Sequence, residues 1–173
     1  MSISTLVCSV VLPTPNWGLD WAWGLPLIVL TVILHVSGLS IMRKAAANAL
    51  QRMQRHHRYQ NLTFVVVLGA TTSLVTILHG FEACIWAVAY VLLHALPDFR
   101  SSMLYSLNAL TSYGHVGMSL EDHWHLLGAL EALNGWLLFG LTTAFLFAVI
   151  EQLGLRVFGF ERRKLESAAE ANA

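Results

Sequence analysis

Long runs of apolar residues, separated by short polar stretches, dominate this sequence. Leu25–Met42 is a run of about 18 apolar residues, close to the length that a helix needs to cross ~30 Å of hydrocarbon. Leu126–Ile150 is a second run of crossing length. Leu62–Leu96, at about 35 residues, is long for one perpendicular crossing and short for two crossings with a turn; Gly80 is a point where its helix can bend.

The polar stretch between the last two runs has a helical pattern of its own. Pro97-Asp98 is a helix-start signal, with Asp98 or Ser101 as the N-cap. A helix over 99–110 would span about 18 Å and reach half-way through a bilayer. Its apolar face consists of Met103, Leu104, Leu107 and Leu110. This face favours a re-entrant helix over an ordinary external loop, which would be mostly polar.

Composition places the chain in a membrane. Of 173 residues, 56% are hydrophobic and 12% are charged, and the mean hydropathy is +0.61. Ten basic and ten acidic residues cancel, so no nucleic-acid partner is indicated. The two cysteines lack CxxC spacing and no nucleotide-binding motif is present. We therefore expect no enzymatic activity, no resident metal and no cofactor.

The basic residues predict how the chain crosses the membrane. They concentrate in 43–58 and 156–164, and such segments face the cytoplasm. An even number of crossings must lie between these two segments, so Leu62–Leu96 counts as one crossing. The N-terminus then faces outward, and three transmembrane helices result. The chain divides into an N-terminal part with the first helix and a basic hairpin (1–60), a pore domain (61–155) and a short cytoplasmic tail (156–173).

Among the polar side chains within the apolar runs are two histidines and an acid, His35, His79 and Glu82. His35 is expected to be a neutral imidazole bonded to a neighbouring helix. His79 and Glu82 are three residues apart on one helix face, and we interpret them as a buried polar pair. A functional role for this pair remains the alternative, because ionisable groups inside a membrane commonly mark functional sites.

One stripe of the last helix is a candidate pore lining. It consists of Asn134, Leu138, Thr142 and Phe145, which follow one another at helical spacing. If the stripe faces a central axis, Asn134 lies beneath the re-entrant loop and Phe145 narrows the cytoplasmic end as a gate. The alternative is a plain contact between helices.

Residues from about 79 to 153 resemble the pore domain of the bacterial two-transmembrane potassium-channel family. The resemblance rests on His79-Gly-Phe-Glu82, Trp86-Ala-Val-Ala-Tyr90, Pro97-Asp98-Phe99, Tyr105-Ser-Leu107, Leu127-Gly-Ala-Leu-Glu-Ala-Leu-Asn-Gly135 and Phe139-Gly-Leu-Thr-Thr-Ala-Phe-Leu-Phe147. It implies an all-α membrane protein with three transmembrane helices, a re-entrant pore helix and a filter loop. It also implies a homotetramer in the lipid bilayer that conducts K⁺ or another monovalent cation.

The filter stretch departs from that family. It comprises Thr111, Ser112, Tyr113, Gly114, His115 and Val116. The family sequence Thr-x-Gly-Tyr-Gly has a second glycine where this chain, aligned without gaps, has Val116. A one-residue gap would instead match Tyr113-Gly114-His115 to Tyr-Gly-Asp. In a K⁺ filter, backbone carbonyls replace the hydration shell of the ion, and β-branched valine is a poor substitute for a glycine with positive φ. We therefore expect weak discrimination between K⁺ and Na⁺.

The sequence thus predicts a homotetrameric pore-loop cation channel of a bacterial inner membrane. Two alternatives stay open: a non-conducting relative with a structural or regulatory role, and a conduit for protons or divalent metal that uses His115. Four copies of His115 near the mouth, each with an unperturbed pKa of about 6.5, would reduce a cation current as the pH falls through that region, because like charges repel entering cations.

The predicted topology can be tested by cysteine labelling at positions 16, 57, 120 and 170. Positions 16 and 120 should react with a membrane-impermeant reagent from outside, and positions 57 and 170 only from the cytoplasmic side, because basic segments stay inside. Labelling of positions 57 and 120 from the same side would contradict the single crossing over Leu62–Leu96.

Overall fold

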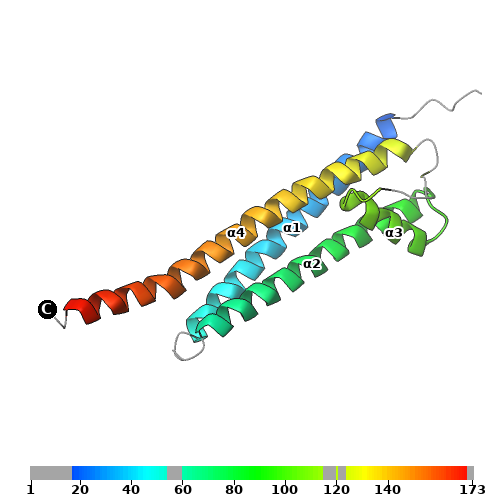
Figure 1. Cartoon of the computed structure of the whole chain (residues 1–173). Helices are drawn as coiled ribbons and strands as arrows, with labels where there is room; N and C mark the ends of the chain where they lie inside the picture. The colour runs from blue at the N-terminus through cyan, green and yellow to red at the C-terminus, as the bar shows by residue number, and fades with distance from the viewer. Residues whose placement is uncertain (1–16, 54–59, 115–119, 121–123, 171–173) are drawn as a thin grey trace, which may run out of the picture.

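The computed structural model describes residues 17–53, 60–114, 120 and 124–170, and of residues 50, 52, 53, 60, 61, 63 and 153–170 only the backbone. These residues form four α-helices and no strand: α1 (Trp17–Met53), α2 (Gln60–Leu92), α3 (Phe99–Leu110) and α4 (His125–Glu170). In Figure 1, α1, α2 and α4 run side by side, α3 lies beside α2 at one end, and α4 extends past the others toward the C-terminus. The all-α prediction is confirmed.

Three of the helices are long and apolar enough to cross a membrane, as predicted. The candidate spans are Trp17–Ala49, Phe64–Leu92 and His125–Gln152, with mean hydropathies of 2.2, 1.8 and 1.8. The long middle run is one continuous helix through Gly80. The last helix continues to Glu170, past the boundary expected near 155.

Helix α1 begins at Trp17, eight residues before the predicted apolar run, and passes through Pro26. The start of α1 packs closely on α4. A Cβ added at Gly24 would lie 2.5 Å from a methyl carbon of Leu130 and 3.4 Å from one of Leu127. This close packing holds the first turns in helical form although Pro26 removes one backbone hydrogen bond.

Helix α3 has the predicted bounds and the predicted cap. The Asp98 side chain accepts a hydrogen bond from the Ser101 backbone N–H at 2.9 Å and another from the Ser101 hydroxyl at 2.7 Å. These two bonds stabilise the carboxylate and hold the pKa of Asp98 below its usual value. Asp98 therefore supports the start of α3 as a charged N-cap.

The buried and exposed faces of α3 are the reverse of those of a surface helix in a water-soluble protein. Its buried residues are Ser102, Tyr105, Ser106 and Ala109. On the opposite face, Leu104 is 51% and Leu107 39% exposed. Small residues on the inner face let the backbones of neighbouring helices approach closely. The apolar face predicted from the sequence is thus the outer face of α3.

Aromatic residues fix α3 between α2 and α4. Trp86 and Tyr90 of α2, Tyr105 of α3 and Leu127 of α4 belong to one buried cluster. The rings of Tyr90 and Tyr105 meet edge to face, with centroids 5.3 Å apart and planes at 82°. This cluster lies at the end of the bundle where α2 turns into α3.

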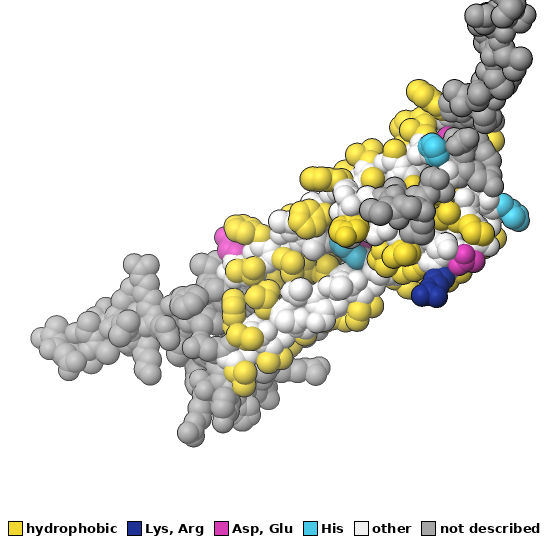
Figure 2. Space-filling model, turned by 45° about the vertical axis from the view of Figure 1, so that its right-hand side comes forward, with side chains coloured by type: hydrophobic (Ala, Val, Ile, Leu, Met, Phe, Trp, Pro, Cys, Tyr) yellow, Lys and Arg dark blue, Asp and Glu magenta, His cyan; other side chains and the backbone are white. Residues whose placement is uncertain are grey.

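The outside of the bundle is strongly apolar. Large side chains exposed on all three long helices include Ile33 (58%), Phe81 (62%) and Phe139 (63%). Figure 2 shows hydrophobic side chains spread over the middle of one face, with the described charged side chains toward the two ends. Such a surface is suited to lipid or to other copies of the chain rather than to water.

The end of α3 rests directly on a glycine of α4. A Cβ built on Gly135 would lie 2.2 Å from the carbonyl oxygen of Leu110 and 2.8 Å from its Cα. Both are backbone atoms, so a side chain at this position must push α3 away from α4. Gly135 therefore sets how closely the two helices approach.

Gly135→Ala should destabilise the protein by about 1–3 kcal/mol, because overpacking against backbone forces the helices apart. The measurement is thermal unfolding in mild detergent. Gly140→Ala is the matched control on the same helix: nothing lies within 4 Å of its added Cβ, and alanine favours a helix over glycine by about 0.5–1 kcal/mol. Equal melting temperatures for the two variants would contradict the close contact at Gly135.

Candidate functional site

The turn after α3 contains the described part of the predicted filter, Thr111 to Gly114. The Tyr113 N–H donates to the Asn108 carbonyl and the Ser112 N–H to the Ala109 carbonyl, both at 3.0 Å. This pairing is a Schellman motif, which needs a residue in left-handed conformation after the C-cap. Ser112 takes that position with a φ of 53°, and Gly114 has a φ of 97°. Left-handed backbone costs a non-glycine residue about 1–2 kcal/mol, so contacts elsewhere must hold Ser112.

Trp136 of α4 provides one such contact. Its indole Nε1–H donates to the Ser112 hydroxyl at 3.0 Å. The Thr111 hydroxyl donates back to the Leu107 carbonyl at 2.7 Å. The turn is thereby tied both to α3 and to α4, while the Tyr113 side chain is 79% exposed.

Beneath this turn lies a pocket of about 380 Å³ between α2, the end of α3 and α4. Ser112 and Trp136 line one side of it, and His79 and Glu82 line another. Most of the remaining wall is apolar and includes Leu107 and Leu138. The pocket therefore connects the turn at residues 111–114 with the predicted polar pair.

A buried carboxyl group joins α4 to α2 and α3. Glu131 is fully buried; its Oε2 accepts a hydrogen bond from the Tyr90 hydroxyl at 2.5 Å, and its Oε1 contacts the Ser106 hydroxyl. Ser106 Oγ also lies 2.9 Å from the Ala83 carbonyl oxygen. The Ser106 hydroxyl has a single hydrogen within reach of two acceptors, the Ala83 carbonyl and Glu131 Oε1. A protonated Glu131 would donate to Ser106 and leave the hydroxyl hydrogen for Ala83. The contacts are thus satisfied by a neutral carboxylic acid.

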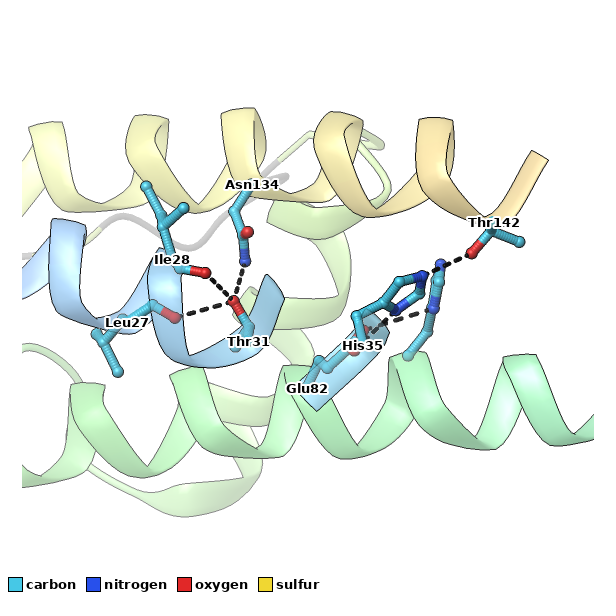
Figure 3. A network of polar contacts seen from close by, with 8 residues as sticks. Leu27, Ile28, Thr31, His35, Glu82, Asn134 and Thr142 are labelled. Carbon is cyan, nitrogen blue, oxygen red and sulfur yellow. Dashed lines mark hydrogen bonds and ion pairs between the residues drawn. The ribbon is translucent and has the colours of Figure 1, made fainter. Parts of the chain in front are cut away.

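A second polar cluster consists of His35, His79, Glu82 and Thr142. Figure 3 labels His35, Glu82 and Thr142 of this cluster. His35 Nδ1 lies 2.8 Å from Glu82 Oε1, and His35 Nε2 lies 3.1 Å from the Thr142 hydroxyl. Both His35 and Glu82 are fully buried. The prediction that His35 bonds to neighbouring helices is confirmed, and the bonds join α1 to α2 and α4.

The predicted pair of His79 and Glu82 is only part of this cluster. His79 Nδ1 and Glu82 Oε2 face each other at 3.5 Å, and neither atom has a hydrogen-bond partner although both are buried. A buried polar atom left without a partner costs about 1–3 kcal/mol. The shorter contact of Glu82 is with His35, which comes from another helix.

The structure places the predicted pore stripe of α4 against α1 of the same chain. Asn134 donates to the Thr31 hydroxyl at 2.9 Å, and Thr142 contacts His35 (Figure 3). Asn134 and Leu138 are buried, Thr142 is nearly so, and Phe145 is half-buried against the cluster of Val67 and Val149. Side chains enclosed within one chain do not face an axis between chains. In this structure the stripe is a contact between helices.

His115 and Val116 lie outside the described residues, as do residues 54–59 of the predicted basic hairpin. The residues that sequence reasoning missed are Tyr90, Ser106 and Glu131, which form one hydrogen-bonded group. The available signal was weak: Glu131 is an acid within an apolar run, and its partners come from other helices.

Comparisons with protein-family models, with curated proteins and with solved structures found no match to this chain. The geometry of the turn and of the two polar clusters therefore carries the functional argument.

The neutral state of Glu131 can be tested by infrared spectroscopy. We expect a C=O stretching band of a protonated, buried carboxyl group, and we expect Glu131→Gln to remove it while the fold remains, since the amide can accept from Tyr90 and donate to Ser106. Glu131→Leu should cost about 1–3 kcal/mol, because the Tyr90 hydroxyl loses its partner.

Glu151→Gln is the control, since Glu151 is an exposed carboxylate on the same helix. It should leave the band of the protonated carboxyl group unchanged. A band that persists in Glu131→Gln would show that the protonated group is another residue.

Proposed function

We propose that four copies of this chain surround one axis and form a pore-loop cation channel in a bacterial plasma membrane, without enzymatic activity. The observation that carries the proposal is where α3 ends. Its last residue rests on Gly135, ten residues from the start of α4 at His125, which corresponds to about 15 Å of helix. That is half of a ~30 Å hydrocarbon core. The chain then turns at Ser112–Gly114 rather than continuing across.

The non-helical backbone of residues 111–114, which would lie half-way through the membrane, supports a tetramer. Non-helical backbone is tolerated inside a membrane only where protein buries it or where it lines a watery cavity. In the single chain, residues 111–114 are exposed. Four chains around an axis would enclose these turns and give them a common water-filled path. The exposed leucines of α3 would then face lipid or the neighbouring chains.

The chemistry of the turn favours a cation. The C-terminal end of a helix carries the negative end of its dipole, and α3 directs this end at the turn. The carbonyls and hydroxyls of Thr111 to Gly114 are oxygen ligands of the kind that replace the hydration shell of a monovalent cation. The left-handed Ser112, held by Trp136, is a strained residue of the sort that clusters at functional sites. The expected weak preference for K⁺ over Na⁺, from Val116, is part of this proposal.

Orientation follows the distribution of basic residues. The N-terminus and the α2–α3–α4 connections would face outward, and the hairpin near 54–59 and the C-terminal end of α4 would face the cytoplasm. With this orientation the filter turn opens to the outside, and the pocket at His79 and Glu82 lies on its inner side.

The proposal is tested by mass and by current. The purified protein in mild detergent should have the mass of a tetramer. In a planar bilayer under opposed K⁺ and Na⁺ gradients, it should carry a cation current whose reversal potential lies well short of the K⁺ equilibrium value. A monomer as the only species would contradict the proposed tetramer. A tetramer without current would favour the non-conducting alternative.

Gly114→Val is the variant that isolates the filter. Its φ of 97° is unfavourable for valine, whereas nothing lies within 4 Å to clash with the added side chain. We expect a tetramer whose current falls at least tenfold. Gly69→Val, at an equally open position in the middle of α2, is the control and should conduct as the native protein does. Equal currents in the two variants would show that the conducting path lies elsewhere.

A further inference from the structure

The cluster of His35, His79 and Glu82 holds three potential metal-ligating side chains from two helices. One ligand atom from each residue lies within 4.8 Å of the other two. The imidazole rings of His35 and His79 lie 5.0 Å apart between centroids, with planes inclined by 51°. Around a tetrahedral Zn²⁺ with bonds of about 2.0–2.2 Å, ligand atoms lie roughly 3.4 Å from one another. Small side-chain rotations would bring the three atoms to that spacing.

Two of the ligand atoms have unsatisfied bonding capacity. Glu82 Oε2 and His79 Nδ1 are buried, face each other at 3.5 Å and have no hydrogen-bond partner. Glu82 is fully buried, so its carboxyl group is shielded from bulk solvent. A cation between these two atoms would give both of them a partner.

The third ligand is oriented by its neighbours. His35 Nε2 lies 3.1 Å from the Thr142 hydroxyl. Figure 3 marks this contact with a dashed line. When Nε2–H donates to Thr142, the lone pair lies on Nδ1, the atom that faces Glu82. Metal-ligating histidines commonly donate their other ring N–H to such a partner, which fixes the tautomer and the ring orientation.

The cluster also has an entrance. His79 and Glu82 line the pocket of about 380 Å³ beneath the filter turn. The pocket has room for an ion to approach and for a water molecule or hydroxide as a fourth ligand.

We propose that His35, His79 and Glu82 bind one divalent transition-metal ion, of which Zn²⁺ is the best fit. Two imidazoles and one carboxylate suit Zn²⁺ and its neighbours, whereas Mg²⁺ and Ca²⁺ prefer oxygen ligands alone. On binding, the hydrogen between His35 Nδ1 and Glu82 Oε1 leaves as a proton, and metal–ligand bonds replace it. The ion would join α1 to α2 next to the pocket. All three ligands come from one chain, so this site does not depend on the proposed tetramer or on conduction.

The test is calorimetric titration of the full-length protein in mild detergent with Zn²⁺, and with Mg²⁺ as a comparison. We expect one Zn²⁺ per chain at this site and no comparable binding of Mg²⁺. His79→Ala and Glu82→Gln should each lower the Zn²⁺ affinity more than tenfold. Thr142→Val, which removes only the partner of His35 Nε2, should lower it by about 10–100-fold.

His94→Asn is the matched control. His94 is exposed in the turn that follows α2, outside the cluster, and its φ of 54° suits asparagine. This variant should bind Zn²⁺ as the native protein does. Absorption by Co²⁺ gives a second readout: the visible bands of a four-coordinate ion should appear in the native protein and in His94→Asn and be lost in His79→Ala.

The His79 side chain is 35% exposed, so His79→Ala is the variant expected to fold in every case. If the native protein binds no Zn²⁺, the proposal is wrong. It is equally wrong if His79→Ala binds the same number of ions with the same affinity, because the metal would then lie on other histidines. Loss of one ion per chain in His79→Ala alone, with any others retained, would support the site.

Discussion

The interior of this bundle must satisfy its polar groups without water. Three helices long enough to cross a membrane enclose His35, Glu82, Glu131, Asn134 and Thr142, and in hydrocarbon each unpaired group would cost several kcal/mol. The side chains therefore bond to one another across helix boundaries. The contact between His35 and Glu82 at 2.8 Å joins α1 to α2, and the contact between His35 and Thr142 joins α1 to α4. The arrangement of the helices depends on these few bonds, since apolar side chains alone would pack in many rotations.

Local signals predicted the local structure. The length of the apolar runs predicts three crossings, and Pro97-Asp98 predicts the start of α3 with Asp98 as its cap. These features depend on neighbours within a turn of helix or on hydropathy summed over a segment, so a single sequence contains them. The helical form of residues 17–24, ahead of the apolar run, was not predictable in this way, because Gly24 packs against Leu130 of another helix.

The sequence did not predict how each helix is rotated about its own axis, and so which of its faces is buried. Hydrophobic periodicity identifies the buried face in water, but in a membrane both faces of a helix are apolar. Hence the apolar residues of α3 predicted a helix face but not what it packs against; in the structure Leu104 and Leu107 are exposed, while Ser102 and Ser106 lie inside. For the same reason, the sequence did not show that the stripe of α4 through Asn134 and Thr142 packs against α1. Which polar groups meet, such as His35 with Glu82, follows from these rotations.

The inward serines of α3 also bear on how the chain is built. Ser106 bonds to the Ala83 carbonyl on α2 and to Glu131 on α4. The binding surface for α3 is therefore formed by the helix that precedes it and the helix that follows it in the sequence. During synthesis α2 emerges first and α4 last. Before α4 has entered the membrane, α3 has only the part of its binding surface that α2 provides, and the side of α3 that packs on α4 would meet lipid. Docking of α3 is therefore a late event in biogenesis, completed by the arrival of the last helix.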